Sequence, residues 1–286
     1  LLISTCCFNF PSHSKASYYF KMDVKPEMYP GYTDEAHPEC FNKEAMPQQP
    51  SVKKPGQLPE SMIKQYFEKG YVIVEDFFKP EELEPCKRDI EKLVDEVAQK
   101  LYTAGLFKDY GFYERLTKLE AEFPGSTVLI LKQGYMPKAF QQLWSNERLL
   151  NVVEQLIGPD IVGHPVWNLR SKVPKNEATI VPWHQDAGYL DNDSYKVMQP
   201  TAWIPLIDAN EKNGCLQIAS RGHKTGKIGQ HQCCWGGTWY VMLEEEEMKN
   251  KLEIDINKDL DVCPVPYGGM VLFNNVIPHR RYADKI

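Results

Sequence analysis

Residues 181–186 read Val-Pro-Trp-His-Gln-Asp and contain a His-x-Asp motif, formed by His184 and Asp186. A second histidine, His279, follows much later in the chain. Two imidazoles and one carboxylate are the ligands of a facial triad, which holds Fe(II) and leaves coordination positions open. On an extended strand, side chains two residues apart lie on one face, so His184 and Asp186 can reach the same metal ion. We therefore predict a metal site formed by His184, Asp186 and His279, with the third ligand supplied by another strand.

The sequence around the His-x-Asp pair indicates whether the pair belongs to a metal site. Alone, such a pair more often forms a polar strand face or a local hydrogen-bonded pair than a metal site. Here an apolar run at 179–181 leads into the motif, and an acidic loop follows at 191–193. Another apolar run occupies 201–206, and a polar loop at 208–216 comes after it. This order favours the metal-site interpretation, although Mn(II), Co(II) or Zn(II) would suit the same ligands.

Five segments, taken in chain order, resemble a known protein family. They are His-Gln-Asp at 184–186, Trp203, Asn-Gly-Cys-Leu at 213–216, Ser-Arg-Gly-His at 220–223 and Pro-His at 278–279. In order and approximate spacing they resemble the phytanoyl-CoA dioxygenase family of Fe(II)/2-oxoglutarate oxygenases. The resemblance extends from about residue 58 to the end of the chain. It implies a family and a reaction type, and it leaves the substrate open.

The resemblance implies that His184, Asp186 and His279 are both the metal ligands and the catalytic residues. In the family, 2-oxoglutarate occupies two coordination positions of Fe(II) through its 1-carboxylate and 2-oxo group, and O2 takes a third. Oxidative decarboxylation then gives succinate and CO2, and a C–H bond of the substrate is oxidised. Relatives that halogenate have a small residue in place of the carboxylate, so the presence of Asp186 favours hydroxylation.

Three further residues, Lys132, Asn168 and Trp203, match positions that line the co-substrate pocket in the family. The alternatives are a solvated lysine for Lys132 and a core tryptophan for Trp203. In the family, an arginine on the strand after the distal histidine anchors the distal carboxylate through a charge-assisted bond. The sequence ends at Ile286 before that position, and Arg281 stands where the family has a small hydroxyl residue. We expect a chain truncated within its last strands, with weaker binding of 2-oxoglutarate.

Length and composition limit the class of protein. The 286 residues are enough for one large domain or two small ones. The net charge of −6 gives no basic surface for nucleic acid, and no apolar run has the length of a membrane span. The eight cysteines lack CxxC spacing, which predicts reduced thiols and a cytoplasmic location. A peroxisomal location would require a signal in the truncated tail.

A proline-rich segment precedes the predicted domain. Residues 1–21 are expected to have little order, and Met22 is the better candidate for the initiator. Residues 23–59 contain many prolines and little apolar periodicity, which is typical of an extended or loosely packed arm. We therefore divide the chain into a poorly ordered arm at 1–57 and one oxygenase-like domain at 58–286.

Hydrophobic periodicity predicts the helices and strands of the domain. Helices are expected from Pro59 to Gly70, from Pro80 onward, at 109–122 and at 139–157. Strands are expected at 71–74, 127–131, 161–172, 179–186, 199–207, 214–218, 261–265 and 269–274, with another around His279. The acidic run at 244–249 indicates a surface insert. Helices first and antiparallel strands later predict a mainly β fold (α+β) with an N-terminal helical layer. With the family resemblance, this becomes a double-stranded β-helix, a jelly roll of the cupin-like kind.

The remaining histidines have ordinary structural interpretations. His223 is expected to fix the conformation of a loop, and His164 is expected in a strand with its hydrogen bonds satisfied. His13, His37 and His231 are expected at the surface. None of the five is predicted to bind the metal.

Three functions are compatible with these patterns. The first is an Fe(II)/2-oxoglutarate-dependent dioxygenase, an oxidoreductase that hydroxylates a small-molecule or lipid-like substrate such as an acyl-CoA. The second is a catalytically silent β-helix binding module, which the missing arginine and Arg281 favour. The third is a cupin-type metalloenzyme that does not use 2-oxoglutarate. The sequence does not indicate the oligomeric state.

Overall fold

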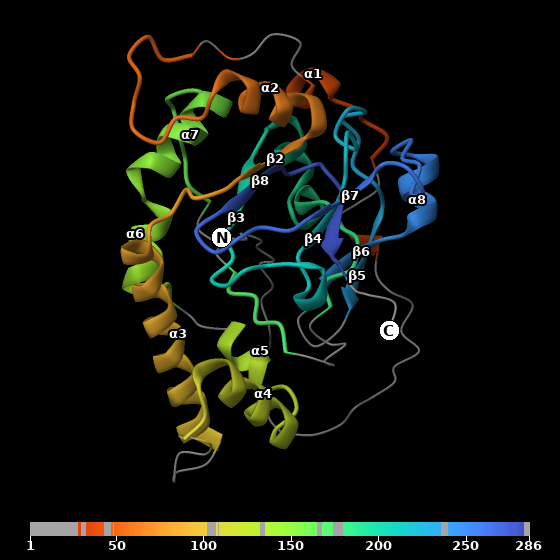
Figure 1. Cartoon of the computed structure of the whole chain (residues 1–286). Helices are drawn as coiled ribbons and strands as arrows, with labels where there is room; N and C mark the ends of the chain where they lie inside the picture. Colours follow the sequence, from red (N-terminus) through yellow and green to blue (C-terminus); the bar gives the residue numbers. More distant parts are fainter. Residues whose placement is uncertain are drawn as a thin grey trace.

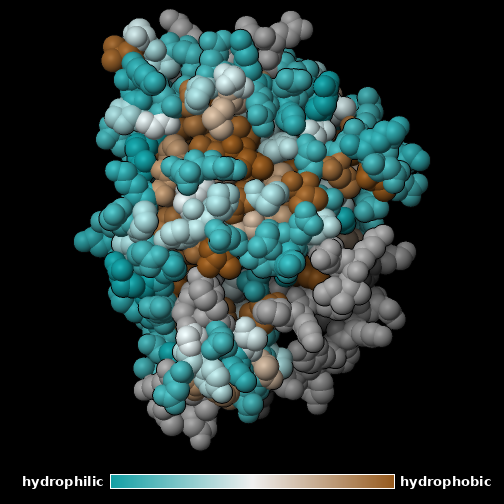
Figure 2. All heavy atoms as spheres, in the orientation of Figure 1, coloured by the Kyte–Doolittle hydropathy of each residue, from teal (hydrophilic) through white to brown (hydrophobic). Residues whose placement is uncertain are grey.

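A computed structural model of the chain describes residues 28–29, 33–42, 47, 49–101, 107, 109–131, 135–164, 168–173, 180–235 and 240–282. Helices form one side of this part of the chain, and antiparallel strands form the other (Figure 1). Among these residues, no helix is both long enough and apolar enough to span a membrane. The face drawn in Figure 2 is hydrophilic at its periphery and gathers apolar side chains at its upper centre.

Helices from the first half of the chain form the layer that the sequence predicts. They are α2 (Glu60–Lys69), α3 (Pro80–Leu101), α4 (Phe112–Glu122), α5 (Ser126–Leu131), α6 (Lys138–Trp144) and α7 (Glu147–Ile157). The long helix α3 packs against α6, and α4 and α5 lie near its C-terminal end (Figure 1). One face of α3 is buried, as expected for an amphipathic helix. Its buried residues are Leu83, Cys86, Ile90, Leu93, Val94, Val97 and Ala98.

The helix that opens the domain ends where the sequence predicts. Gly70 follows α2 with a φ of 84°, a left-handed conformation that favours glycine. A Cβ placed there would come within 2.4 Å of His223 Nδ1. The Nε2 atom of His223 donates a hydrogen bond to the Phe67 carbonyl oxygen at 3.0 Å. The loop that carries His223 is therefore fixed to the end of α2, in agreement with the expectation for this histidine.

The segment predicted as a strand at 127–131 is instead helix α5. Its start is fixed by the carboxylate of Glu120, which accepts hydrogen bonds from the backbone N–H groups of Gly125 (2.8 Å) and Thr127 (2.8 Å). The Ser126 hydroxyl donates to the same carboxylate at 3.1 Å. These bonds satisfy donors that the first turn of a helix leaves without a partner. Because the capping carboxylate comes from the preceding helix, the apolar pattern of the segment itself does not indicate a helix.

The helix predicted at 139–157 is two helices, α6 and α7, separated at Ser145 and Asn146. The Asn146 side chain accepts hydrogen bonds from the backbone N–H groups of Arg148 (3.0 Å) and Leu149 (3.3 Å). An asparagine in this role starts a new helix. Hydrophobic periodicity continues across the break, which is why it suggests a single helix.

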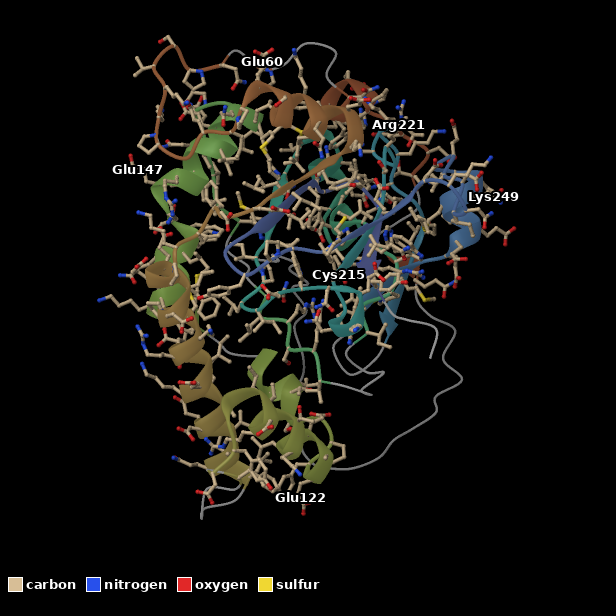
Figure 3. All side chains as sticks on the ribbon, viewed as in Figure 1. Glu60, Glu122, Glu147, Cys215, Arg221 and Lys249 are labelled. Atoms are coloured by element: carbon tan, nitrogen blue, oxygen red, sulfur yellow. The ribbon has the colours of Figure 1, made fainter. Side chains whose placement is uncertain are left out.

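The described strands form three antiparallel sheets of three strands each. The first contains, in order, β2 (Tyr71–Val74), β8 (Met270–Asn274) and β3 (Pro200–Trp203); the second contains β7 (Leu260–Cys263), β4 (Leu216–Ala219) and β9 (His279–Arg281). The third contains β1 (Met28–Tyr29), β5 (His231–Trp235) and β6 (Tyr240–Leu243). The first two sheets share an apolar cluster of Tyr71, Leu216, Ile218, Cys263, Val265, Val271, Phe273 and Ile277. Cys215, which precedes β4, is fully buried and is labelled near the middle of the view in Figure 3.

Several strands differ from their predicted extent. Those expected at 199–207, 214–218, 261–265 and 269–274 are present in shorter or shifted form as β3, β4, β7 and β8. The described residues of 161–172 and 179–186 form no regular strand, and the latter segment turns into the 3-10 helix η2 (Asp186–Tyr189). Two more short 3-10 helices are η3 (Asn192–Lys196) and η4 (Glu211–Asn213). The acidic run forms the surface helix α8 (Glu245–Asn250), as predicted.

Part of the N-terminal arm is described, and it contacts the domain. Strand β1 pairs with β5, and Ala36 forms an isolated bridge with Lys227. The short helix α1 (Pro38–Phe41) buries Phe41 completely. Residues 1–27 lie outside the described residues, and the division between arm and domain at residue 57 stays a prediction.

The cysteines are only partly as expected. Cys40, Cys86, Cys215 and Cys263 are free, in agreement with the prediction of reduced thiols. Cys233 is disulfide-bonded, so the prediction is wrong for this residue. The sequence does not indicate this disulfide bond, because the composition and spacing of cysteines do not show which sulfur atoms the fold brings together.

Candidate metal centre

His184 and His279 come together through their backbones. The two residues form an antiparallel bridge, in which His184 N donates to His279 O at 3.0 Å and His279 N donates to His184 O at 2.9 Å. The centroids of their imidazole rings are 4.2 Å apart. Asp186 is the first residue of the 3-10 helix η2, and Gln185 before it is extended, with φ −107° and ψ 137°. That one extended residue is enough to place Asp186 on the same side as His184.

Three ligand atoms of these residues converge. Asp186 Oδ1 lies 3.6 Å from His184 Nε2 and 3.6 Å from His279 Nε2. All three side chains are buried, and none of the three atoms has a hydrogen-bond partner. A buried polar atom without a partner is costly and rare. The three atoms lie within 4.8 Å of one another, so a single metal ion could satisfy all of them.

Hydrogen bonds on the far side of each ligand orient it. The Nδ1 atom of His184 donates to the Pro182 carbonyl oxygen (2.9 Å), and the Nδ1 atom of His279 donates to the Ile277 carbonyl oxygen (3.1 Å). Because a carbonyl only accepts, both neutral rings carry their proton on Nδ1 and present the Nε2 lone pair to the site. The Thr201 hydroxyl donates to Asp186 Oδ2 at 2.8 Å and leaves Oδ1 to face the imidazoles. Such outer hydrogen bonds are typical of metal sites.

Burial shifts the pKa values of His184 and Asp186 in opposite directions. Burial, followed by the neighbouring His279, lowers the pKa of His184 well below its usual value. Burial raises the pKa of Asp186, although His279 and the Thr201 hydrogen bond act in the opposite direction. The histidine is therefore held neutral, as a metal ligand must be. A divalent cation would supply the positive charge that the buried Asp186 carboxylate lacks.

Another buried histidine, His231, supports the segment between the ligands His184 and Asp186. The Nε2 atom of His231 accepts a hydrogen bond from Gln185 N (3.0 Å), while its Nδ1 donates to the Gly229 carbonyl oxygen (2.8 Å). The Gln185 side chain donates to the carbonyl oxygens of Lys227 (3.0 Å) and Val276 (2.5 Å). The surface position predicted for His231 is wrong, because it is fully buried in the unpredicted strand β5. These bonds hold Gln185 extended and so fix the spacing of His184 and Asp186.

A cavity of about 730 Å³ lies between the helical layer and strand β3, and its lining does not include the triad residues themselves. Its helical wall is largely apolar and includes Ile90, Leu116, Ile130, Phe140 and Leu143. The opposite wall is the segment 168–173 together with Trp203. Trp203 is two residues after Thr201, the hydrogen-bond donor to Asp186, so the cavity adjoins the ligand set. Arg170 on the same wall is close enough for its positive charge to lower the pKa of Asp186 against the larger effect of burial.

A comparison with protein families identifies the family of the chain. The family described as phytanoyl-CoA dioxygenase (PhyH) matches residues 66–280. The chain belongs to the phytanoyl-CoA dioxygenase family. The matched residues include the whole His184, Asp186 and His279 triad and both walls of the cavity described above.

Two curated relatives and one solved structure are similar to the chain. A probable alpha-ketoglutarate-dependent hypophosphite dioxygenase from Stutzerimonas stutzeri is 25% identical over 173 residues, which cover 59% of this chain and 54% of the relative. Phytanoyl-CoA dioxygenase domain-containing protein 1 from Danio rerio is 23% identical over 268 residues, covering 79% of this chain and 85% of the relative. The chain thus spans about half the length of the first relative. The crystal structure of EctD from S. alaskensis with 2-oxoglutarate and 5-hydroxyectoine is 15% identical, with a TM-score of 0.48 and coverage of 93% of this chain and 81% of the other. This similarity is too low to establish a shared fold.

The remaining residues predicted from the family are placed as follows. Trp203 and Asn168 both line the cavity beside the triad, and the Nδ2 atom of Asn168 is buried without a hydrogen-bond partner. Lys132 lies outside the described residues. Sequence reasoning missed Thr201 and Arg170. Thr201 could have been suggested by its place two residues before Trp203 on a predicted strand, whereas nothing in the sequence pattern singles out Arg170.

Proposed function

We propose that the protein is an Fe(II)/2-oxoglutarate-dependent dioxygenase that hydroxylates a small organic molecule, with release of succinate and CO2. The observation that carries the proposal is the convergence of three buried, partnerless atoms: His184 Nε2, Asp186 Oδ1 and His279 Nε2. Two neutral imidazoles and one carboxylate are the ligand set of non-haem Fe(II) oxygenases. Membership of the phytanoyl-CoA dioxygenase family supports the same reaction type.

Each residue of the site has a role in this proposal. Bound Fe(II), with 2-oxoglutarate and O2, would supply the oxidising chemistry. His184 and His279 hold the metal through Nε2, and the hydrogen bonds from their Nδ1 atoms to backbone carbonyls keep the rings in place. Thr201 keeps one oxygen of Asp186 occupied, so that the other is directed to the metal. Because all three ligand side chains are buried, bulk water is excluded from their face of the site.

Two residues are assigned to the co-substrate. We place Trp203 and Asn168 against 2-oxoglutarate, since both line the cavity that adjoins the triad. Lys132 keeps this role on the family resemblance alone. The substrate itself would enter the same cavity, whose apolar helical wall would accommodate a small or lipid-like molecule.

The proposed fold is a double-stranded β-helix over residues 58–286. Two observations support it: the sheets β2-β8-β3 and β7-β4-β9 are antiparallel, and they enclose one apolar cluster between them. A cytoplasmic location remains part of the proposal; the free thiols of Cys40, Cys86, Cys215 and Cys263 favour it, whereas the disulfide-bonded Cys233 does not.

The proposal is tested by measuring succinate formed from 2-oxoglutarate in the presence of Fe(II), together with metal binding by calorimetry. We expect turnover by the wild type, and neither turnover nor metal binding by His184→Ala. The matched control is His223→Ala, since His223 is equally buried but belongs to a loop fixed to α2. Metal binding without any binding of 2-oxoglutarate would overturn the proposal. It would leave a cupin-type metalloenzyme or a binding module as the function.

A further inference from the structure

The cavity wall at 168–172 is rich in hydrogen-bond donors that have no acceptor. Asn168 Nδ2, Arg170 Nε and Ser171 Oγ are all buried without a hydrogen-bond partner. Lys172 lines the same wall and adds an ammonium group. Buried polar groups are nearly always paired, with protein, water or a ligand. Because these unpaired groups can all donate hydrogen bonds, the wall is suited to a ligand that carries hydrogen-bond acceptors.

The same wall carries positive charge without a counter-ion. Among the described residues, no carboxylate lies within ion-pair distance of Arg170 or Lys172. The Arg170 guanidinium lies 4.8 Å from the centroid of the Tyr240 ring, and Lys172 Nζ lies 5.0 Å from the centroid of the Trp203 ring. Both cations are therefore stabilised by aromatic faces and not by a carboxylate.

Burial of Lys172 near another cation disfavours its charged form. Its ammonium group donates to the Gly214 carbonyl oxygen. Burial, and then the charge of Arg281, lowers the pKa of Lys172 to about 7. A Cβ added to Gly214 would come within 2.4 Å of Arg281 Nε, so Arg281 lies at the same place. An anion bound here would offset the repulsion between these cations and restore the charge of Lys172.

We infer that Asn168, Arg170 and Lys172 form a carboxylate-binding strip in the cavity wall, next to the metal triad. All three residues line the cavity along one short segment of chain. An arginine and a lysine beside an amide are suited to a carboxylate, because charge-assisted bonds are short and strong. The inference rests on the proposed function, and it names residues that the family resemblance does not supply, apart from Asn168.

The carboxylate could come from either of two molecules. One is the distal carboxylate of 2-oxoglutarate, whose other end would chelate the metal. The other is a substrate carboxylate whose apolar body contacts the helical wall at Leu116, Ile130 and Phe140. Asn168, Arg170 and Lys172 would bind either carboxylate through the same groups, and two experiments distinguish the two sources.

The first experiment measures the affinity of the Fe(II)-loaded protein for 2-oxoglutarate and 2-oxobutyrate without O2. The two acids share the chelating end, but 2-oxobutyrate has no distal carboxylate. Loss of one charge-assisted bond in Lys172→Met corresponds to a loss of affinity of about 10- to 100-fold. A loss of this size for 2-oxoglutarate, with 2-oxobutyrate unchanged, assigns the strip to the co-substrate. The control is Lys118→Met, because Lys118 lines the same cavity from helix α4 and contacts Tyr110 instead of Trp203.

The second experiment measures binding of hexanoate and hexan-1-ol in the presence of saturating 2-oxoglutarate. Weaker binding of hexanoate alone in Lys172→Met and Arg170→Gln assigns the strip to the substrate. If both variants bind all four probes within twofold of the wild type, or if Lys118→Met has the same effect as Lys172→Met, the strip does not exist. Circular dichroism and Fe(II) binding by each variant show that it is folded. Failure of the wild type to bind either 2-oxo acid would reject the proposed function, and the hexanoate experiment would still decide the strip.

Discussion

Replacing Thr201 with valine tests how the metal ligands are oriented. The Thr201 hydroxyl donates to Asp186 Oδ2 at 2.8 Å, and Asp186 is only 5% exposed. Valine keeps the shape of the side chain and removes the donor, so a buried carboxylate oxygen loses its partner. A hydrogen bond to a charged group is worth about 1.5–3 kcal/mol. Because the Asp186 carboxylate could then rotate and turn Oδ1 away from the imidazoles, we expect metal affinity to fall by about 10- to 100-fold.

The assay is an anaerobic titration with Co(II), which replaces Fe(II) and reports its coordination by absorbance. The matched control is Thr127→Val, because Thr127 is fully buried and its hydroxyl has no hydrogen-bond partner. We expect this control to bind Co(II) like the wild type. Wild-type affinity in a folded Thr201→Val variant would refute the view that this hydrogen bond directs Asp186 toward the metal.

Three further outcomes are expected. Removal of the metal with a chelator should lower the melting temperature of the wild type but not of His279→Ala, because a ligand at one hundred times its Kd stabilises the folded protein by about 2.7 kcal/mol. Equal shifts of the melting temperature in both proteins would contradict the assignment of His279 as a metal ligand. His231→Phe leaves the backbone N–H of Gln185 without its acceptor, and urea unfolding should show a loss of about 1–3 kcal/mol; an unchanged midpoint would show that His231 does not support the ligands. Burial lowers the pKa of His223 to about 4, below its ordinary value near 6.5. The contribution of His223 to the free energy of unfolding is therefore fully present above pH 6.5, and about 3 kcal/mol of it is lost as the pH falls toward 4. The free energy of unfolding of His223→Gln should depend less on pH over this range.

The sequence predicts those parts of the site that depend on local geometry. His184 and Asp186 are two residues apart, and a single extended residue, Gln185, is enough to bring them to one side. The prediction of a full strand there is wrong, yet the side chains still converge, because their geometry needs only Gln185 to be extended. His279 is predicted as a third ligand supplied by another strand, and the structure brings it to the other two through a backbone bridge.

Residues that act through distant contacts are not predicted. The surface position predicted for His231 is wrong because its burial depends on the pairing of β5 with β6 and on a hydrogen bond from the backbone of Gln185. Helix α5 is mistaken for a strand because Glu120, outside the segment, caps its start. In both cases the deciding hydrogen bond joins residues whose contact appears only after folding, and hydrophobic periodicity carries no information about it.

The unpaired atoms of the site have opposite character on its two sides. At the triad, His184 Nε2 and Asp186 Oδ1 offer lone pairs and need a cation. On the cavity wall, Arg170 Nε has no hydrogen-bond partner and offers a proton, and the ammonium group of Lys172, which donates to the Gly214 carbonyl oxygen, adds positive charge. Water could satisfy either group, but it would leave the charges of Arg170 and Lys172 uncompensated. Under the proposed function, a metal-chelating molecule with a second carboxylate would satisfy both sets of atoms, and the binding experiments with 2-oxoglutarate and 2-oxobutyrate test whether they act together.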